Sequence, residues 1–339
     1  GDERILRRMQ METKILDVDV LNIDEGKIAE AAELIRSGRL VAFPTETVYG
    51  LGANAENDEA VKSIFRAKGR PSDNPLIVHV SDIAMCERYV KKIPKGAEAL
   101  MAHFWGGPLT IIMEKSPLAC QSVSAGLDTV GIRLPSHPVA HALIKAADIG
   151  IAAPSANISG KPSPTLAEHV IADFSERIDC IISSGAAKYG VESTVIDMSE
   201  EIPKVLRPGA VSLDMIREIL PDAEYGGGGK GIPKSPGMKY KHYSPDAKVY
   251  VVRSDMKKTA EKFPDGTVII DYEKGDYPGK IFLSAGENDS DYAARLFYLL
   301  RMADEKGAKT VLARDPAGGF PVTDALINRL YKSAGGEMI

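Results

Sequence analysis

The stretch RLVAFPTETVYGLG, residues 39–52, decides the fold because an apolar segment runs directly into a polar loop. The apolar part predicts a strand over residues 39–45, and polar side chains crowd its carboxyl end. Sheets in α/β proteins place ligands at this end of their strands. A simpler interpretation stays open from these residues alone, namely a turn in which Thr45 and Thr47 satisfy backbone groups.

Elements on both sides of this stretch extend the pattern. Residues 24–37 repeat apolar residues at helical spacing and end before Gly38, and Asn57 caps a helix that runs to Lys68. Further strands are predicted over residues 14–20, 76–80, 109–113, 130–134, 150–152, 178–182, 194–197 and 204–206, and further helices near 82–90, 95–104, 137–147, 166–174 and 212–220. Strands that alternate with helices in this way predict an α/β domain with a mixed sheet.

A stretch rich in glycine and proline, GGGGKGIPKSPGMKYKHYSP, occupies residues 226–245 and excludes helix and central strand there. Strands over residues 248–252, 267–270, 280–283 and 310–313 and helices over 290–305 and 321–333 follow it. These short strands and crossover helices predict a small Rossmann-like parallel sheet. We therefore predict an α/β domain over residues 14–225, a basic linker over 226–245 and a second domain over 246–339.

Composition and charge exclude several classes of protein. The 339 residues hold 42 Lys and Arg against 47 Asp and Glu, and this net charge of −5 argues against a generally basic nucleic-acid coat. Three widely separated cysteines exclude a disulfide framework. No apolar run approaches the ~20 residues of a membrane helix, and residues 1–10 lack the apolar region of a signal peptide. We expect an irregular N-terminal tail on a cytoplasmic protein with no membrane partner.

Several weak motifs predict no site. The four glycines at 226–229 with Lys230 lack the Ser or Thr and the strand–helix frame of a P-loop. His137 and His141 have the spacing of metal ligands on a helix, but no third ligand accompanies them. The sequence holds no GxSxG elbow, which makes a serine hydrolase a poor hypothesis.

Four further polar segments lie at element ends of the first domain. KGRPSDNPL (residues 68–76) holds Lys68 and Arg70 in a loop that its prolines make rigid, as suits a polyphosphate, although cations also stabilise a helix C-terminus without any ligand. In APSANISGK (153–161), Ser155 or Asn157 could equally cap the next element. The other two segments are GVESTV (190–195) and LRPG (206–209). Together the segments predict a cleft for an anionic, polar ligand.

The segments PTETVYGLG, KGRPSDNPL, VGIRLP, APSANISGKPSPT, GVESTV and RPG occur in this order across residues 43–209. This series resembles the YrdC-type threonylcarbamoyl-AMP synthases, and the linker ending in SPGMKYKHYSP with its second domain resembles the long, two-domain form of that family. The resemblance spans about residues 14–335 and implies a YrdC-like N-terminal domain with a twisted mixed sheet. One departure is Ser183-Ser-Gly185, where the family usually has an acidic residue and two glycines.

The same resemblance implies an enzyme of the nucleotidyltransferase class. Such enzymes make L-threonylcarbamoyladenylate from L-threonine, bicarbonate and ATP and release pyrophosphate. Mg²⁺ would accompany ATP as the cofactor, with no metal ligands from protein side chains. The product would serve the N6-threonylcarbamoyl modification of the adenosine 3′ of the anticodon in ANN-decoding tRNAs. Expected partners are the downstream threonylcarbamoyl-transferase machinery and, through a weak contact, tRNA. Because such transfers depend mostly on positioning and charge neutralisation, a site rich in Lys, Arg, Ser and Asn fits.

Roles of single residues follow from the resemblance. The resemblance implies that Lys68 and Arg70 are the catalytic residues. Its ATP-binding residues are Lys68, Ser72, Thr129, Ser155, Asn157, Ser163, Arg207 and Tyr243. Its threonine-binding residues are Thr45, His79, Arg133 and Ser193. Arg133 would pair the amino-acid carboxylate, whereas His79 has an alternative as a packed, satisfied histidine on an apolar strand. Lys68 is expected in an exposed loop, where replacing it would leave stability nearly unchanged.

The linker is predicted to be a lid. Its glycines form a hinge, its lysines (Lys230, Lys234, Lys239 and Lys241) have no local acid to pair with, and Tyr243 would reach the nucleotide. A plain solvated tether is the alternative.

Two other functions remain to be weighed against the synthase. An RNA-binding module without catalysis conflicts with the acidic balance of the chain. Carbamoyl adenylation, as in hydrogenase-maturation proteins, would bring zinc-finger-like and acylphosphatase-like segments that this sequence does not show.

Overall fold

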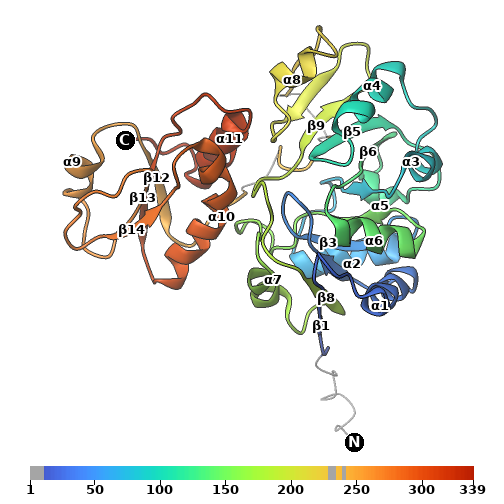
Figure 1. Cartoon of the computed structure of the whole chain (residues 1–339), viewed down its shortest axis with the longest axis horizontal. Coiled ribbons are helices and arrows are strands. Elements are labelled where there is room, and N and C mark those ends of the chain that lie inside the picture. Colours follow the sequence, from blue (N-terminus) through green and yellow to red (C-terminus); the bar gives the residue numbers. More distant parts are fainter. Residues whose placement is uncertain (1–10, 228–233, 239–241) are drawn as a thin grey trace, which may run out of the picture.

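The computed structural model describes residues 11–227, 234–238 and 242–339. Figure 1 shows two α/β bodies, a larger one formed by the first part of the chain and a smaller one formed by the last part. The larger body contains an eleven-stranded mixed sheet in the order β1-β8-β2-β3-β7-β4-β6-β5-β9-β10-β11. The smaller body contains a four-stranded sheet in the order β12-β15-β13-β14. This architecture confirms the predicted fold class.

The elements of the larger body alternate along the chain. Its strands are β1 (Lys14–Asp17), β2 (Val41–Phe43), β3 (Gly50–Asn54), β4 (Ile77–His79), β5 (Leu109–Glu114), β6 (Thr129–Arg133), β7 (Ile151–Ala152), β8 (Cys180–Ser183), β9 (Thr194–Asp197), β10 (Lys204–Arg207) and β11 (Glu224–Tyr225). Its helices are α1 (Glu25–Arg36), α2 (Asp58–Lys68), α3 (Ile83–Tyr89), α4 (Lys95–Phe104), α5 (Gln121–Ser124), α6 (Pro138–Ala147), α7 (Ala167–Phe174) and α8 (Leu213–Arg217).

The smaller body has the predicted Rossmann-like arrangement. Its strands are β12 (Lys248–Val252), β13 (Val268–Asp271), β14 (Ile281–Ser284) and β15 (Thr310–Arg314), and its helices are α9 (Met256–Ala260), α10 (Asp289–Glu305) and α11 (Thr323–Ser333). The pairs β12–β15, β13–β15 and β13–β14 are all parallel. In Figure 1, α10 and α11 lie on the side of this sheet that faces the larger body.

Strand β3 is missing from the sequence prediction. Its sequence, GLGAN, is poor in the β-branched and aromatic residues that mark a strand. The structure shows why glycine is needed: a Cβ on Gly52 would lie 2.8 Å from Cγ2 of Ile151 and 2.9 Å from the ring of Phe43. The prediction also misses β11, α5 and α9, which are too short to show a periodic pattern.

The two bodies share buried surface. The core of the smaller body includes Val48 and Val191 from the larger body and Tyr243 from the segment between them. Among the helices of the described residues, none is long and apolar enough to cross a membrane. The predicted irregular tail over residues 1–10 lies outside the described residues.

Candidate functional site

A pocket gathers residues that end or follow strands of the large sheet. Thr45 follows β2, and His79, Arg133 and Arg207 are the last residues of β4, β6 and β10. Eight predicted site residues line this pocket: Thr45, Arg70, His79, Arg133, Ser155, Ser193, Arg207 and Tyr243. The structure therefore brings residues predicted for ATP and residues predicted for threonine to one place.

One part of the pocket, here called the paired wall, is formed by the lining residues Thr45, Thr47, His79 and Arg133 together with Glu46, which bonds to Arg133 behind the lining. Nη2 of Arg133 donates to Oε1 of Glu46 at 2.5 Å, and Nη1 donates to Oγ1 of Thr47 at 3.0 Å. Burial would raise the pKa of Glu46, but Arg133 outweighs that effect and holds the pKa below its usual value. Both ions are about 5% exposed, so this wall holds a buried ion pair.

Thr45 and His79 in the paired wall are held by the backbone. Oγ1 of Thr45 donates to the carbonyl of Val48 at 2.5 Å, as the simpler turn interpretation required, although Thr45 also lines the pocket. Nδ1 of His79 lies 3.2 Å from the carbonyls of Ile77 and Ile151, so it carries the proton. Burial, and then Arg133, lowers the pKa of His79 to about 3. His79 is therefore a neutral, packed histidine at physiological pH.

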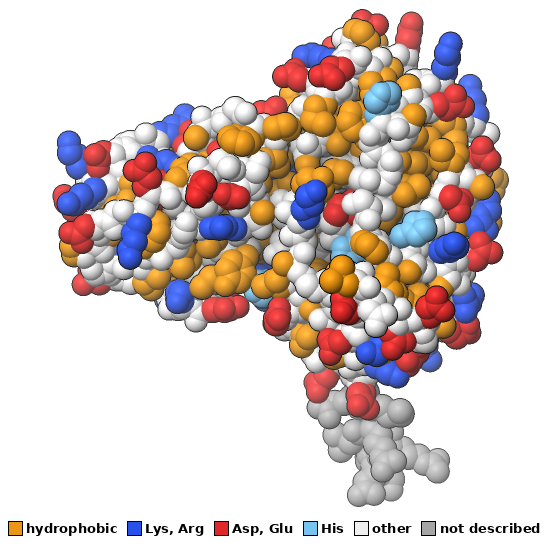
Figure 2. Space-filling model, viewed as in Figure 1, with side chains coloured by type: hydrophobic (Ala, Val, Ile, Leu, Met, Phe, Trp, Pro, Cys, Tyr) orange, Lys and Arg blue, Asp and Glu red, His pale blue; other side chains and the backbone are white. Residues whose placement is uncertain are grey.

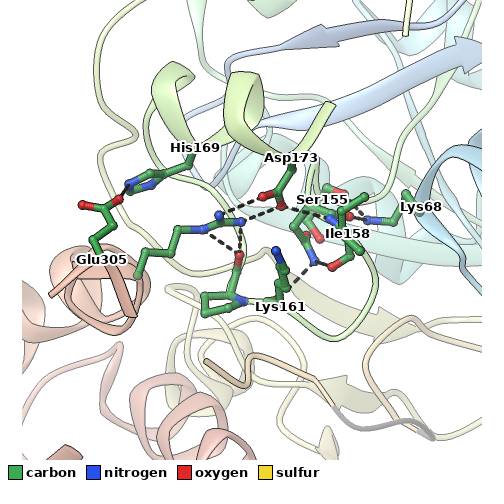
Figure 3. Close-up of polar contacts among 10 residues, drawn as sticks. Lys68, Ser155, Ile158, Lys161, His169, Asp173 and Glu305 are labelled. Carbon is green, nitrogen blue, oxygen red and sulfur yellow. Dashed lines mark hydrogen bonds and ion pairs between the residues drawn. The ribbon is translucent and has the colours of Figure 1, made fainter. Parts of the chain in front are cut away.

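A second part of the pocket, here called the cationic wall, is formed by Arg70 and Arg207, with Lys68 directly behind the lining. Lys68 ends α2 and is only 2% exposed, which corrects the expectation of an exposed loop. Its Nζ donates to the carbonyls of Ser155 and Asn157, and Figure 3 shows it directed at this loop. Burial lowers the pKa of Lys68 well below its usual value. The sequence misses this burial because a lysine at a helix end is normally solvated.

The two arginines of the cationic wall also donate to neutral groups. Arg70 donates to the carbonyl of Pro75 at 3.1 Å, and Arg207 donates to the carbonyl and Oγ of Ser193 at 3.0 and 3.1 Å. Burial, and then the charge of Arg207, lowers the pKa of Arg70 to about 10. Burial, and then Arg329, lowers the pKa of Arg207 to about 10. Among the residues that the structure describes, no carboxylate forms a hydrogen bond with the cations of this wall.

Five predicted residues do not line the pocket: Lys68, Ser72, Thr129, Asn157 and Ser163. Lys68, Asn157 and Ser163 lie directly behind the lining, because Lys68 bonds to the carbonyl of Ser155 and Ser163 bonds to Glu192. Ser72 is exposed, and Thr129 begins β6 at the end opposite Arg133. The geometry leaves the roles of Ser72 and Thr129 as predictions.

Sequence reasoning missed several residues around the pocket. Glu192 lines it and lies inside the quoted segment GVESTV, where its acidic side chain among small hydroxyls was a usable signal. His242 also lines it. Arg329, which contacts Glu192 from α11, lies in no motif and gave no signal.

The linker contributes Pro236, Gly237, His242 and Tyr243 to the lining, and the free volume of the pocket is about 60 Å³. Tyr243 is stacked on Phe297 of α10 with ring centroids 5.2 Å apart. Lys234 corrects the prediction of unpaired lysines, because its Nζ lies 3.0 Å from Asp197 and 2.8 Å from Glu200. The other three lysines, Lys230, Lys239 and Lys241, lie outside the described residues.

The part of the chain that the structure describes holds no group of three or more His, Cys, Asp or Glu residues that could bind an ion. The carboxylates beside the pocket, Glu46 and Glu192, are bound by arginines. His137 accepts from the backbone N–H of Val139 as the N-cap of α6, and His141 bonds to the carbonyl of Ser81.

Comparison with known proteins identifies the family of the chain. Residues 33–209 match the Sua5/YciO/YrdC family model, described as "Telomere recombination". The chain belongs to this family. Residues 211–335 match the model of the C-terminal domain of threonylcarbamoyl-AMP synthase. The resemblance inferred from the sequence is confirmed.

Similar proteins cover nearly the whole chain. The threonylcarbamoyl-AMP synthase of Pyrococcus abyssi is 44% identical over 333 residues, which are 94% of this chain and 96% of that protein. The synthase of Bacillus subtilis is 43% identical over 352 residues, covering 97% and 100%. The crystal structure of P. abyssi Sua5 complexed with L-threonine has a TM-score of 0.91 at 43% identity and covers 96% of this chain and 99% of that one. The chain is an enzyme of a family that includes these nucleotidyl-transferring synthases.

Proposed function

We propose that this chain is a threonylcarbamoyl-AMP synthase that joins L-threonine, bicarbonate and ATP and releases pyrophosphate. The observation that carries the proposal is a single pocket that is lined both by the arginines of the cationic wall and by the neutral histidine and paired arginine of the paired wall. Triphosphate and a carboxylate are the ligands that such donors recognise. The long relatives of similar sequence carry the same name, which supports the proposal.

The chemistry needs no titrating side chain. The amine of threonine takes up bicarbonate with loss of water to form a carbamate. A carbamate oxygen then attacks the α-phosphorus of ATP, and the bond to the β-phosphate oxygen breaks with release of pyrophosphate. Arg70 and Arg207 would neutralise the leaving phosphates, as electrostatic catalysis of such transfers requires. Nε of Arg133, which has no partner among the described residues, is the donor we assign to the threonine carboxylate.

Magnesium enters this proposal only with the substrate. Because the side chains around the pocket do not form a metal site, we propose that Mg²⁺ arrives bound to the phosphates of ATP. The product would go to a threonylcarbamoyl-transferase that modifies the adenosine 3′ of the anticodon in ANN-decoding tRNAs. On the face in Figure 2, acidic and basic side chains are interspersed over both bodies, which supports at most a weak contact with tRNA.

The lid prediction becomes a proposal about the four linker residues in the pocket. Ligand pockets usually enclose about 300–1,000 Å³. The free 60 Å³ is far below that range, so Pro236, Gly237, His242 and Tyr243 must move before ATP enters. Limited proteolysis tests this proposal. Cleavage near Lys234 in the free protein should be suppressed by ATP with threonine, whereas equal cleavage in both samples would leave only a tether.

The proposed reaction is tested by incubating the protein with ATP, bicarbonate and L-threonine and measuring pyrophosphate. We expect release that requires threonine and bicarbonate together. Release that instead requires carbamoyl phosphate would assign carbamoyl adenylation. RNA binding with no release under any condition would overturn the synthase in favour of a binding module.

A further inference from the structure

One arginine of the smaller body reaches the wall of the pocket in the larger body. Arg329 lies on α11 and is fully buried. Its Nε donates to Oε2 of Glu192 at 3.0 Å, its Nη2 donates to the carbonyl of Glu192 at 3.0 Å, and its Nη1 donates to the carbonyl of Pro208 at 2.6 Å. A single guanidinium therefore joins two segments of the chain that are distant in sequence.

These two segments carry residues of the proposed site. Glu192 directly precedes Ser193, and Pro208 directly follows Arg207, which itself donates to the carbonyl of Ser193 at 3.0 Å. The remaining oxygen of Glu192, Oε1, accepts a hydrogen bond from Ser163. Burial would raise the pKa of Glu192, but Arg329, Arg207 and the bond from Ser163 lower it below the usual value. Glu192 is thus a charged link between Arg329 and three predicted ligand contacts.

A second arginine of the smaller body braces the neighbouring loop. Arg301 of α10 donates to both carboxylate oxygens of Asp173 at 3.1 and 2.9 Å and from Nη2 to the carbonyl of Pro162 at 2.8 Å. Asp173 accepts from the backbone N–H of Ile158 at 3.0 Å. Figure 3 shows Asp173 facing Ile158, with Ser155 and Lys68 beyond it. Side chains of α10 and α11 therefore both donate hydrogen bonds to backbone carbonyls beside the pocket.

We propose that Arg329 is a positioning residue for the pocket, acting through Glu192 and Pro208 to fix Ser193, Arg207 and Ser163. This inference rests on the proposed function. Among the described residues, Arg329 meets the pocket lining at Glu192 and at the ring of Tyr243, over which its guanidinium lies at 5.8 Å. Its loss should displace the groups that meet ATP, and a substitution that keeps the charge opposite Glu192 separates this effect from a loss of stability.

The first test is the kinetics of Arg329→Lys, which keeps the charge and loses the planar fork. We expect the KM for ATP in threonine-dependent pyrophosphate release to rise about tenfold, with kcat within a few-fold of wild type. Arg314→Lys is the matched control. Arg314 also bonds to a carboxylate, Asp271, and to a carbonyl, that of Ser254, but lies away from the pocket. A KM for ATP that is unchanged in Arg329→Lys, as in this control, would overturn the proposal.

The second test asks whether Arg329 acts through Glu192. Glu192→Gln keeps the shape and removes the charge, so it should also raise the KM for ATP, and the double variant should show no more than the larger single effect. Additive effects of the two substitutions on the KM for ATP would show that Arg329 does not act through Glu192. If Arg329→Lys does not fold, an unchanged KM in Glu192→Gln serves as the contradicting result.

A third measurement separates failure of this inference from failure of the proposed function. ATP should raise the melting temperature of wild type more than that of Arg329→Lys. Wild type that releases no pyrophosphate but still shows this difference would refute the reaction and retain the positioning role. Equal shifts in wild type and variant would refute the positioning role.

Discussion

The two walls of the pocket differ in the groups that pair with their positive charges. In the paired wall, the guanidinium of Arg133 lies 2.5 Å from the carboxylate of Glu46, and the two charges cancel. In the cationic wall, Lys68, Arg70 and Arg207 donate to carbonyl or hydroxyl oxygens, which carry no net charge. The pKa values of all three are lowered, first of all by burial. One wall is neutral without a ligand. The other holds cations that make no hydrogen bond to a described carboxylate, and Glu192 offsets only part of the charge of Arg207, which an anion would compensate further.

This difference separates stability from function. Removing one member of a buried ion pair leaves its partner charged and unpaired, which destabilises a protein strongly. Removing a buried cation that has no carboxylate partner takes away an unfavourable charge. Substitutions in the paired wall should therefore damage the fold, whereas substitutions in the cationic wall should damage the use of ATP.

The largest effect on stability is expected for Arg133→Met. This change leaves Glu46 buried without its partner, so we expect the free energy of unfolding in urea to fall by about 3–5 kcal/mol. The double variant Arg133→Met with Glu46→Gln should recover much of the loss, because the unpaired charge is gone. A decrease in the free energy of unfolding of less than 1 kcal/mol in Arg133→Met would show that the paired wall does not stabilise the fold.

The largest effect on activity is expected for Arg207→Met. Its guanidinium donates to Ser193 and faces no hydrogen-bonded carboxylate, so we expect a free energy of unfolding within about 1 kcal/mol of wild type. The value of kcat/KM for ATP should fall about 100-fold, because charge-assisted bonds to phosphate are lost. Unfolding of this variant at the level of Arg133→Met would show that both walls are structural.

A smaller effect is expected for Arg133→Lys. The ammonium keeps the charge opposite Glu46, so stability should change little, but the Nε donor that we assign to the threonine carboxylate is lost. We expect the KM for threonine to rise about tenfold with the KM for ATP unchanged. An unchanged KM for threonine would remove Arg133 from the threonine site.

The smallest effect concerns pH. Burial, then Arg329 and Arg207, lower the pKa of Lys332 from 10.5 to about 8, and its ammonium donates to the carbonyl of Gly237. Between pH 8 and 10.5 the unfolded chain binds more protons at this residue than the folded chain, so its contribution to stability rises with pH. The free energy of unfolding of wild type, measured in urea, should therefore rise relative to that of Lys332→Met between pH 8 and pH 10.5. Parallel profiles would contradict the lowered pKa.

The sequence predicts most of the fold and the strand ends at which the pocket lies. Regular alternation of apolar strands and amphipathic helices is a local pattern, and polar segments at strand ends mark the pocket before any coordinates exist. The antiparallel strand β3 is missed because Gly52 is selected by contact with Ile151 and Phe43, and contacts between distant segments leave no local signal. The burial of Lys68 is missed for the same reason, since its carbonyl partners at Ser155 and Asn157 are far along the chain.

The role of the smaller body is the part that sequence could not supply. Arg301 and Arg329 are charged residues on amphipathic helices, where a solvated position is the ordinary expectation. Both are buried at the junction, and each bonds to a carboxylate of the larger body. Only the packing of α10 and α11 against the pocket reveals these contacts.

The central claim, that the cationic wall holds charge for an anion, is tested most directly by melting the protein with inorganic pyrophosphate. Pyrophosphate should raise the melting temperature of wild type and should leave that of the Arg70→Met, Arg207→Met double variant unchanged. In the absence of pyrophosphate, the double variant should melt at or above the temperature of wild type, because two cations that make no hydrogen bond to a described carboxylate are gone. Equal stabilisation of both proteins by pyrophosphate would contradict the claim.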